Sequence, residues 1–147
     1  MGYKQGMEQG PQLQVKAAQE LNFRGEHLLV VEDNDHNYFY LEVVFEPYNL
    51  RLTRAATGSK ALQMLKSGER FDLVVLDIRI PEMDGWEVLR QLRISHPTLP
   101  VMGHTAYAFE TDRKRGLELG MNAFLTKPAR PRDLVETVHE LLMTHKI

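Results

Sequence analysis

Hydrophobic residues occur in this chain in two alternating patterns. Residues 28–31 and 73–76 are aliphatic runs of four, too short for an ordinary helix, and they predict strands that are buried on both faces. Elsewhere apolar residues recur every three or four positions, as Leu134, Val138, Leu141 and Leu142 do, which predicts amphipathic helices. The chain therefore predicts strands that alternate with helices.

The alternation repeats along the chain. Strands are expected over residues 27–31, 51–55, 73–76, 100–104 and 122–126. Helices are expected over residues 35–46, 58–66, 86–96, about 106–119 and from 131 onward, with proline and glycine at several of their ends. Right-handed crossovers then give an α/β fold, a doubly wound five-stranded parallel sheet with helices on both faces.

Residues 1–25 do not continue this pattern. They are rich in Gln, Gly and Glu, and Pro11 could open a short helix that aligns Leu13, Ala17 and Leu21. A poorly ordered leader is the favoured interpretation, and a remnant linker from a longer parent is the alternative. The predicted domain covers residues 26–147.

Polar side chains stand where the predicted strands end. Glu32 and Asp33 follow the first strand, Asp77 the third, Thr105 the fourth and Lys127 the fifth. The carboxyl ends of parallel strands share one edge of the sheet, where ligands bind in open α/β folds. Three carboxylates gathered there raise one another's pKa unless they hold a cation. This edge therefore predicts a metal site, with oxygen ligands that suit Mg²⁺.

Composition excludes several other classes of site. The net charge of −2 gives no basic stripe for direct binding of nucleic acid, and the absence of cysteine excludes disulfides and thiolate chemistry. The six histidines include no pair four residues apart, which disfavours a transition metal. No apolar run is long enough to span a membrane or direct export, so a cytoplasmic protein is the default expectation.

The predicted site has the components of phosphoryl transfer. A carboxylate can act as the nucleophile and form an aspartyl phosphate. Asp33 and Asp77 can bind the cation, while Lys127 and the Thr105 hydroxyl can neutralise the phosphoryl oxygens. Each residue alone has an ordinary interpretation as a helix cap or a turn, but their convergence at one edge favours a functional site.

Four motifs, in order, resemble the receiver domain of bacterial two-component response regulators: VVEDN (30–34), VVLDIRIPEMDG (74–85), HTA (104–106) and FLTKP (124–128). The resemblance covers residues 26–147 and implies the (βα)5 flavodoxin-like receiver fold. It also implies a role for each matching position: Asp77 is the phosphoacceptor, Glu32, Asp33 and the backbone carbonyl of Arg79 join it in binding Mg²⁺ or Mn²⁺, Thr105 and Lys127 bind the phosphoryl group, and Phe124 is the switch aromatic that turns inward.

The resemblance implies partners as well. A histidine kinase or a histidine phosphotransfer protein would supply the phosphoryl group, and the surface of the fourth helix, fifth strand and fifth helix would switch toward a downstream protein partner that is unknown. Such a module promotes its own phosphorylation and dephosphorylation but is not a turnover enzyme. Phosphorylation-dependent homodimers on that surface are a habit of the family and do not follow from the spacing.

Some positions depart from the commonest family pattern. Glu32 replaces a frequent Asp, and Gly103 and His104 stand where two aliphatic residues usually precede the threonine. We expect His104 to be a partly buried, hydrogen-bonded imidazole without a catalytic role. Arg79 and Tyr107, two residues beyond Asp77 and Thr105, are expected to shield the acyl phosphate. Residues 113–115, Arg-Lys-Arg, predict a solvated helix face, with a docking surface as the alternative.

Three alternatives stay open. A phosphatase of the haloacid-dehalogenase kind uses similar residues but wants a second Asp two positions after the nucleophile, where this chain has Arg79. A receiver-like scaffold would bind partners without phosphorylation. Residues 23–34 and Asn37 resemble receivers fused behind hybrid histidine kinases, so the domain could also be excised from such a protein.

Overall fold

The computed structural model describes residues 21–106 and 109–144, and it contains one parallel sheet. The strands are β1 (Glu26–Val31), β2 (Leu50–Ala55), β3 (Leu73–Leu76), β4 (Val101–Thr105) and β5 (Ala123–Thr126). They lie in the order β2-β1-β3-β4-β5, and every neighbouring pair is parallel. This confirms the predicted doubly wound α/β fold.

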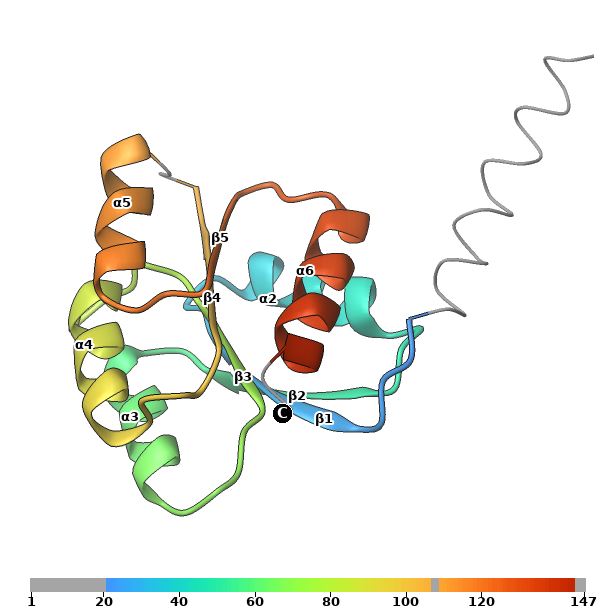
Figure 1. Cartoon of the computed structure of the whole chain (residues 1–147), viewed down its shortest axis with the longest axis horizontal. Helices are drawn as coiled ribbons and strands as arrows, with labels where there is room; N and C mark the ends of the chain where they lie inside the picture. Colours follow the sequence, from blue (N-terminus) through green and yellow to red (C-terminus); the bar gives the residue numbers. More distant parts are fainter. Residues whose placement is uncertain (1–20, 107–108, 145–147) are drawn as a thin grey trace, which may run out of the picture.

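Helices cover both faces of the sheet. They are α2 (Asp35–Phe45), α3 (Gly58–Lys66), α4 (Gly85–Ser95), α5 (Glu110–Glu118) and α6 (Pro131–Thr144). Figure 1 shows α2 and α6 on one side of the sheet and α3, α4 and α5 on the other. Among the described residues, no helix combines the length and the apolar character that crossing a bilayer requires.

The two faces of the sheet bury separate apolar clusters. On β1, Leu29 and Val31 join the cluster beneath α3 and α4, whereas Leu28 and Val30 join the cluster beneath α2 and α6. All four side chains are fully buried or nearly so. In a strand that is covered on both faces, the side chains pointing to either face are buried. Apolar residues therefore follow one another without alternating with polar ones, which explains the continuous aliphatic run.

One helix differs from its prediction. The helix expected from about residue 106 begins at Glu110, and Ala106 is not helical. The Phe109 N–H donates to Asp112 Oδ2 at 3.2 Å, and this contact fixes the start of the helix. Tyr107 and the predicted leader helix before Leu21 lie outside the described residues.

A half-buried arginine ties the far end of α4 to the rest of the fold. Arg93 donates from Nε and Nη2 to the Gly120 carbonyl, at 2.9 and 2.7 Å. Its Nη1 donates to the carbonyls of His96 and Leu99, at 2.9 and 2.7 Å, and Nη2 also donates to Asn122 Oδ1 at 2.9 Å. Burial lowers the pKa of this guanidinium. Arg93 therefore joins α4 to the turn before β4 and to the turn before β5.

Candidate functional site

Three carboxylates meet at the carboxyl edge of the sheet. Glu32 and Asp33 follow β1, and Asp77 follows β3, the strand paired with it through Val31 and Leu76. Each residue offers a carboxylate oxygen, and these three oxygens lie within 4.8 Å of one another. Glu32 and Asp77 are buried, whereas Asp33 is exposed. The predicted convergence of the acidic residues therefore occurs.

Lys127, which follows β5, reaches both buried carboxylates. Its Nζ donates to Asp77 Oδ2 at 2.9 Å and to Glu32 Oε1. Burial raises the pKa of Glu32, the hydrogen bond and charge of Lys127 partly offset this, and the Asp77 charge adds the smallest contribution. The raised pKa of Glu32 is therefore caused mainly by burial and only slightly by repulsion from the Asp77 carboxylate.

The backbone fixes the position of Asp77. Its N–H donates to the Val31 carbonyl at 3.1 Å, and its Oδ1 accepts from the Arg79 N–H at 3.1 Å. Behind it, a Cβ on Gly85 would lie 2.8 Å from the Asp77 carbonyl oxygen and 2.5 Å from Ile78 Cα. Only glycine fits at this close approach, so residue 85 shapes the loop that carries the carboxylate.

Thr105 brings an uncommitted hydroxyl to the same edge. It ends β4, which pairs with β3 through Leu76 and Gly103, and its carbonyl accepts from the Lys127 N–H at 2.8 Å. Thr105 is fully buried, and within the described residues its Oγ1 has no hydrogen-bond partner. An unpaired buried hydroxyl costs about 1–3 kcal/mol, so this group is suited to bind an incoming oxygen.

The donor set fits a hard divalent cation. Mg²⁺ binds oxygen at about 2.1 Å, so opposite ligands of its octahedron lie about 4.2 Å apart. The 4.8 Å spread of the three carboxylates needs a slight closure or a bridging water to meet that geometry. Participation of the Arg79 carbonyl stays a prediction.

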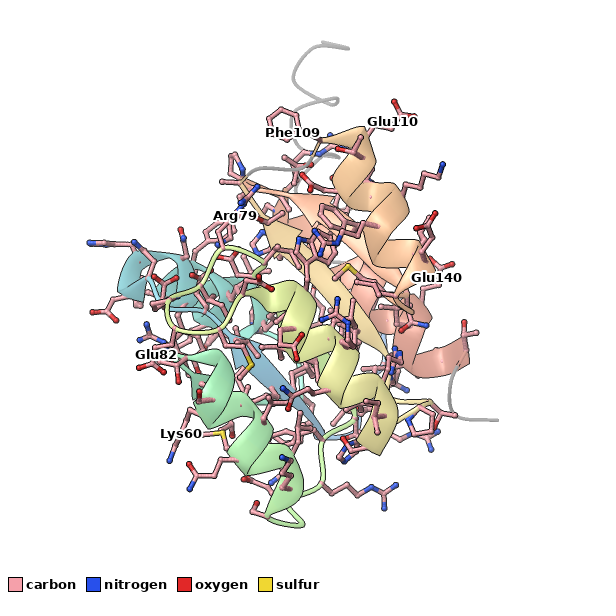
Figure 2. All side chains as sticks on the ribbon, turned by 90° about the vertical axis from the view of Figure 1, so that its left-hand side faces the viewer. Lys60, Arg79, Glu82, Phe109, Glu110 and Glu140 are labelled. Carbon is pink, nitrogen blue, oxygen red and sulfur yellow. The ribbon has the colours of Figure 1, made fainter. Side chains whose placement is uncertain are left out.

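The loop after β3 connects the site to two helices. Figure 2 shows Arg79 on the side of Phe109 and Glu110, at the start of α5, and Glu82 toward α3. Arg79 shares a surface cavity of about 470 Å³ with Asp112 and Arg115 of α5. A Cβ on Gly58, the first residue of α3, would lie 3.2 Å from the Met83 carbonyl oxygen. The loop thus touches α3 on one side and faces α5 on the other.

Phe124 lies inward in this structure. Its ring is buried in the cluster beneath α3 and α4, and the Arg113 guanidinium lies 5.5 Å from the ring centre. A Cβ on Gly103 would come within 3.1 Å of Phe124 Cδ2 and 2.6 Å of Met121 Sδ. The unusual glycine in β4 therefore provides the room that Phe124 and Met121 fill. Whether Phe124 acts as a switch stays a prediction.

His104 differs from its prediction. The residue is 3% exposed rather than partly buried, and its Nε2 has no hydrogen-bond partner within the described residues. It lines a cavity together with Tyr40, Lys127 and Pro128. Burial, and secondarily the charge of Lys127, lowers the pKa of His104 to about 4. The imidazole is therefore held neutral at neutral pH.

This burial predicts sensitivity to acid. As pH falls below about 6.5, the unfolded chain takes up a proton at residue 104 before the folded protein does, so the free energy of unfolding falls by up to about 3 kcal/mol as pH approaches 4. Urea unfolding at pH 7.5 and pH 5 should show that His104→Val loses less stability over this interval than the wild type. Equal losses would contradict the expectation.

The basic residues 113–115 of α5 are exposed, and two of them also contact neighbouring groups. Arg113 Nη1 donates to the Phe124 carbonyl at 3.0 Å, and the Arg115 guanidinium lies 4.8 Å from the Trp86 ring centre. All three residues are exposed, which confirms the predicted solvated face. Two of the three cations also pack on aromatic rings.

Arg54 belongs to none of the sequence motifs, yet it touches the acidic loop. Its Nε donates to the Glu32 carbonyl at 2.9 Å. A single arginine at the end of a weak strand forms no motif. Only the acidic run after the neighbouring strand could have indicated the contact.

Comparisons with known proteins agree with this fold. The family model of the response regulator receiver domain matches residues 28–139. The chain therefore belongs to the response regulator receiver family. Members of this family are signalling modules of two-component systems, which bind Mg²⁺ and interact with histidine kinases and phosphotransfer proteins.

Two relatives illustrate the range of parent proteins. The chain is 35% identical over 120 residues to the alkaline phosphatase synthesis transcriptional regulatory protein PhoP of Bacillus subtilis, covering 82% of this chain and 50% of PhoP. It is 36% identical over 115 residues to an uncharacterized 14.6 kDa protein of Leptolyngbya boryana, covering 77% of this chain and 87% of that protein. The chain thus spans about half the length of PhoP.

Solved structures share the fold. The receiver domain of sensor histidine kinase PA1611 from Pseudomonas aeruginosa, with a magnesium ion coordinated in its active site cleft, is 30% identical with a TM-score of 0.74, covering 82% of this chain and 99% of that domain. A CheY-like receiver domain protein from Methanospirillum hungatei is 29% identical with a TM-score of 0.76, covering 84% of this chain and 98% of that chain.

Proposed function

We propose that this receiver domain accepts a phosphoryl group on Asp77, in a Mg²⁺-dependent reaction, from a histidine kinase or a histidine phosphotransfer protein. The observation that carries the proposal is the contact of Lys127 Nζ with Asp77 Oδ2 at 2.9 Å, beside the acidic pair Glu32 and Asp33. A cation donor next to a buried carboxylate can bind the oxygens of a phosphoryl group as it arrives. The cytoplasm is where such a donor would meet the domain.

The reaction forms one bond and breaks another. A carboxylate oxygen of Asp77 attacks the phosphorus, the P–N bond to the donor imidazole breaks, and its electron pair leaves with the nitrogen. The Arg79 N–H holds one Asp77 oxygen by a 3.1 Å hydrogen bond and orients the carboxylate. Lys127 and the unpaired Thr105 hydroxyl would bind phosphoryl oxygens. Glu32, Asp33, Asp77 and the Arg79 carbonyl would hold Mg²⁺, whose positive charge would be available to the phosphoryl oxygens.

The proposed output surface comprises α5, β5 and α6. Thr105 and Lys127 are joined through a 2.8 Å backbone hydrogen bond. Phe124 lies on β5, the strand that ends just before Lys127. A shift of Thr105 toward the phosphoryl group would therefore act on the packing of β4, β5 and α5. A downstream protein or a second copy of the chain would bind that surface.

The proposal is tested by incubation with acetyl phosphate. With Mg²⁺ the wild type should take up one base-labile phosphoryl group per chain, as measured by intact-protein mass. Asp77→Asn should lose the adduct because an amide is not a competent nucleophile, and chelation of the metal with EDTA should suppress it in the wild type. Asp133→Asn is the matched control, since Asp133 is on the surface of α6 and paired with Arg130.

Other outcomes would support the alternatives. Sustained hydrolysis of phosphate esters would indicate a phosphatase, although the residue two positions after Asp77 is Arg79 and offers no general acid there. No adduct under any condition would indicate a scaffold that works without phosphorylation. A hybrid-kinase parent, the other alternative, is compatible with the likeness to the PA1611 receiver.

A further inference from the structure

Arg54 is the next-to-last residue of the edge strand β2, and its guanidinium lies against the acidic loop. Its Nε donates to the Glu32 carbonyl and its Nη2 to the Asp33 carbonyl, both at 2.9 Å. Its Nη1 contacts Asp35 Oδ1 at 2.7 Å. The guanidinium also lies 5.2 Å from the centre of the Tyr38 ring. All three guanidinium nitrogens are therefore bonded to one short segment.

This segment is the one that aims two of the three carboxylates. The Glu32 N–H donates to the Ala55 carbonyl at 3.0 Å, so the β1–β2 pairing reaches as far as the acidic pair. Arg54 then binds the next two carbonyls, those of Glu32 and Asp33, and the first residue of α2. Charge-assisted hydrogen bonds in this fork geometry restrict orientation as well as adding energy. The backbone beneath both side chains is thereby fixed to β2.

We propose that Arg54 is a positioning residue for the divalent-cation site. By bonding the carbonyls of Glu32 and Asp33, it holds their carboxylates ready for the ion, so that less loop ordering accompanies binding. The inference rests on the proposed function, since it concerns the same cation. Groups that orient metal ligands from behind typically change metal affinity by about 10- to 100-fold.

Electrostatics alone predicts the opposite sign. A positive charge near a cation site repels the ion, so its removal should strengthen binding. In this structure the Arg54 charge is paired with Asp35 at 2.7 Å, which reduces the field of the guanidinium at the site. The pairing with Asp35 does not weaken the two hydrogen bonds by which Arg54 holds the carbonyls of Glu32 and Asp33. Positioning should therefore outweigh repulsion, and the sign of the effect distinguishes the two roles.

The test is a Mg²⁺ titration of the full chain, followed by fluorescence of Trp86, the one tryptophan, which stands in the first turn of α4 after the Asp77 loop. Arg54→Met should bind Mg²⁺ about tenfold more weakly than the wild type. Arg54→Lys should be weakened similarly, because one ammonium group cannot reproduce the three-point fork. Arg51→Met is the matched control: it removes a cation from the same strand, where Arg51 donates to the Gly25 carbonyl at 3.3 Å.

Each result separates the roles. Equal or tighter binding by Arg54→Met overturns the positioning role, and so does wild-type affinity in Arg54→Lys, which would show that charge alone matters. Thermal unfolding of each variant shows the folded fraction, and the titrations are made below the onset of unfolding. If Arg54→Met does not fold, Arg54→Lys decides the question. A wild type without a saturable Mg²⁺ response would count against the cation site itself and not against Arg54 alone.

Discussion

Replacing Lys127 with methionine should lower the free energy of unfolding at pH 7 by about 3–5 kcal/mol, because two buried carboxylates would lose their shared cation. The Lys127 side chain is 11% exposed, and the side chains of Glu32 and Asp77 are 2% and 9% exposed. Solvent therefore cannot replace the ammonium group. Urea unfolding followed by circular dichroism measures the loss.

The pH dependence of this loss has a definite sign. Burial already raises the pKa of Glu32, and removal of Lys127 would raise it further, because its hydrogen bond and charge act in the opposite direction. A carboxyl with a raised pKa in the folded state is most favourable at low pH, and its contribution to stability falls as pH rises through that pKa. The difference in free energy of unfolding between the wild type and Lys127→Met should therefore be smaller at pH 5 than at pH 7.

Mg²⁺ should also reduce the difference in free energy of unfolding between the wild type and Lys127→Met at pH 7, since the ion would supply the missing positive charge. Lys114→Met, which removes an exposed lysine of α5, is the control and should change stability by less than about 0.5 kcal/mol. A loss at Lys127→Met no larger than that of the control would contradict the expectation.

Arg93→Met should lower the free energy of unfolding by about 3 kcal/mol, through contacts that lie at the opposite edge of the sheet from Asp77. Methionine keeps much of the apolar stem but leaves the carbonyls of Gly120, His96 and Leu99 without the guanidinium that they share. These residues are half-buried, and a carbonyl that loses its donor costs up to about 1–3 kcal/mol, less where water reaches it.

Arg90→Met gives the matched comparison on the same helix. Arg90 is exposed and pairs with Glu87 one turn away, so its loss should cost less than about 0.5 kcal/mol. Thermal or urea unfolding of both variants measures the difference. Acetyl phosphate labelling of folded Arg93→Met should be retained, because its contacts lie away from Asp77. Similar stability of the two variants would show that the Arg93 network contributes little.

The sequence predicted the fold well where the physics is local. The aliphatic run of β3 and the helix over residues 58–66 have their predicted bounds, because a doubly buried strand and a strongly amphipathic helix each leave a clear pattern. The predicted start of α5, at about residue 106, was wrong, because the helix begins at Glu110. The side chains of α5 are mostly polar, so the helix has little hydrophobic periodicity. Its first residue is set by the capping contact between Phe109 and Asp112, which no periodic pattern indicates.

The same distinction holds at the candidate site. Asp77 and Lys127 follow strands whose parallel order was predictable, so their meeting could be expected from topology. The Arg54 fork and the complete burial of His104 depend on side-chain directions and on which neighbours fill the space. A linear pattern does not contain that information. The acidic run and the unusual residue before Thr105 indicated only where to look.

Gly103 has an evolutionary consequence. Met121 Sδ would lie 2.6 Å from a Cβ on Gly103 and 3.1 Å from a Cβ on Gly116 of α5, so one thioether fills the volume that two side chains would need. Bulk added to β4 must therefore be removed from the turn before β5. Relatives with an aliphatic residue at the position of Gly103 should carry a smaller one at that of Met121, a size covariation that alignments of this family can reveal.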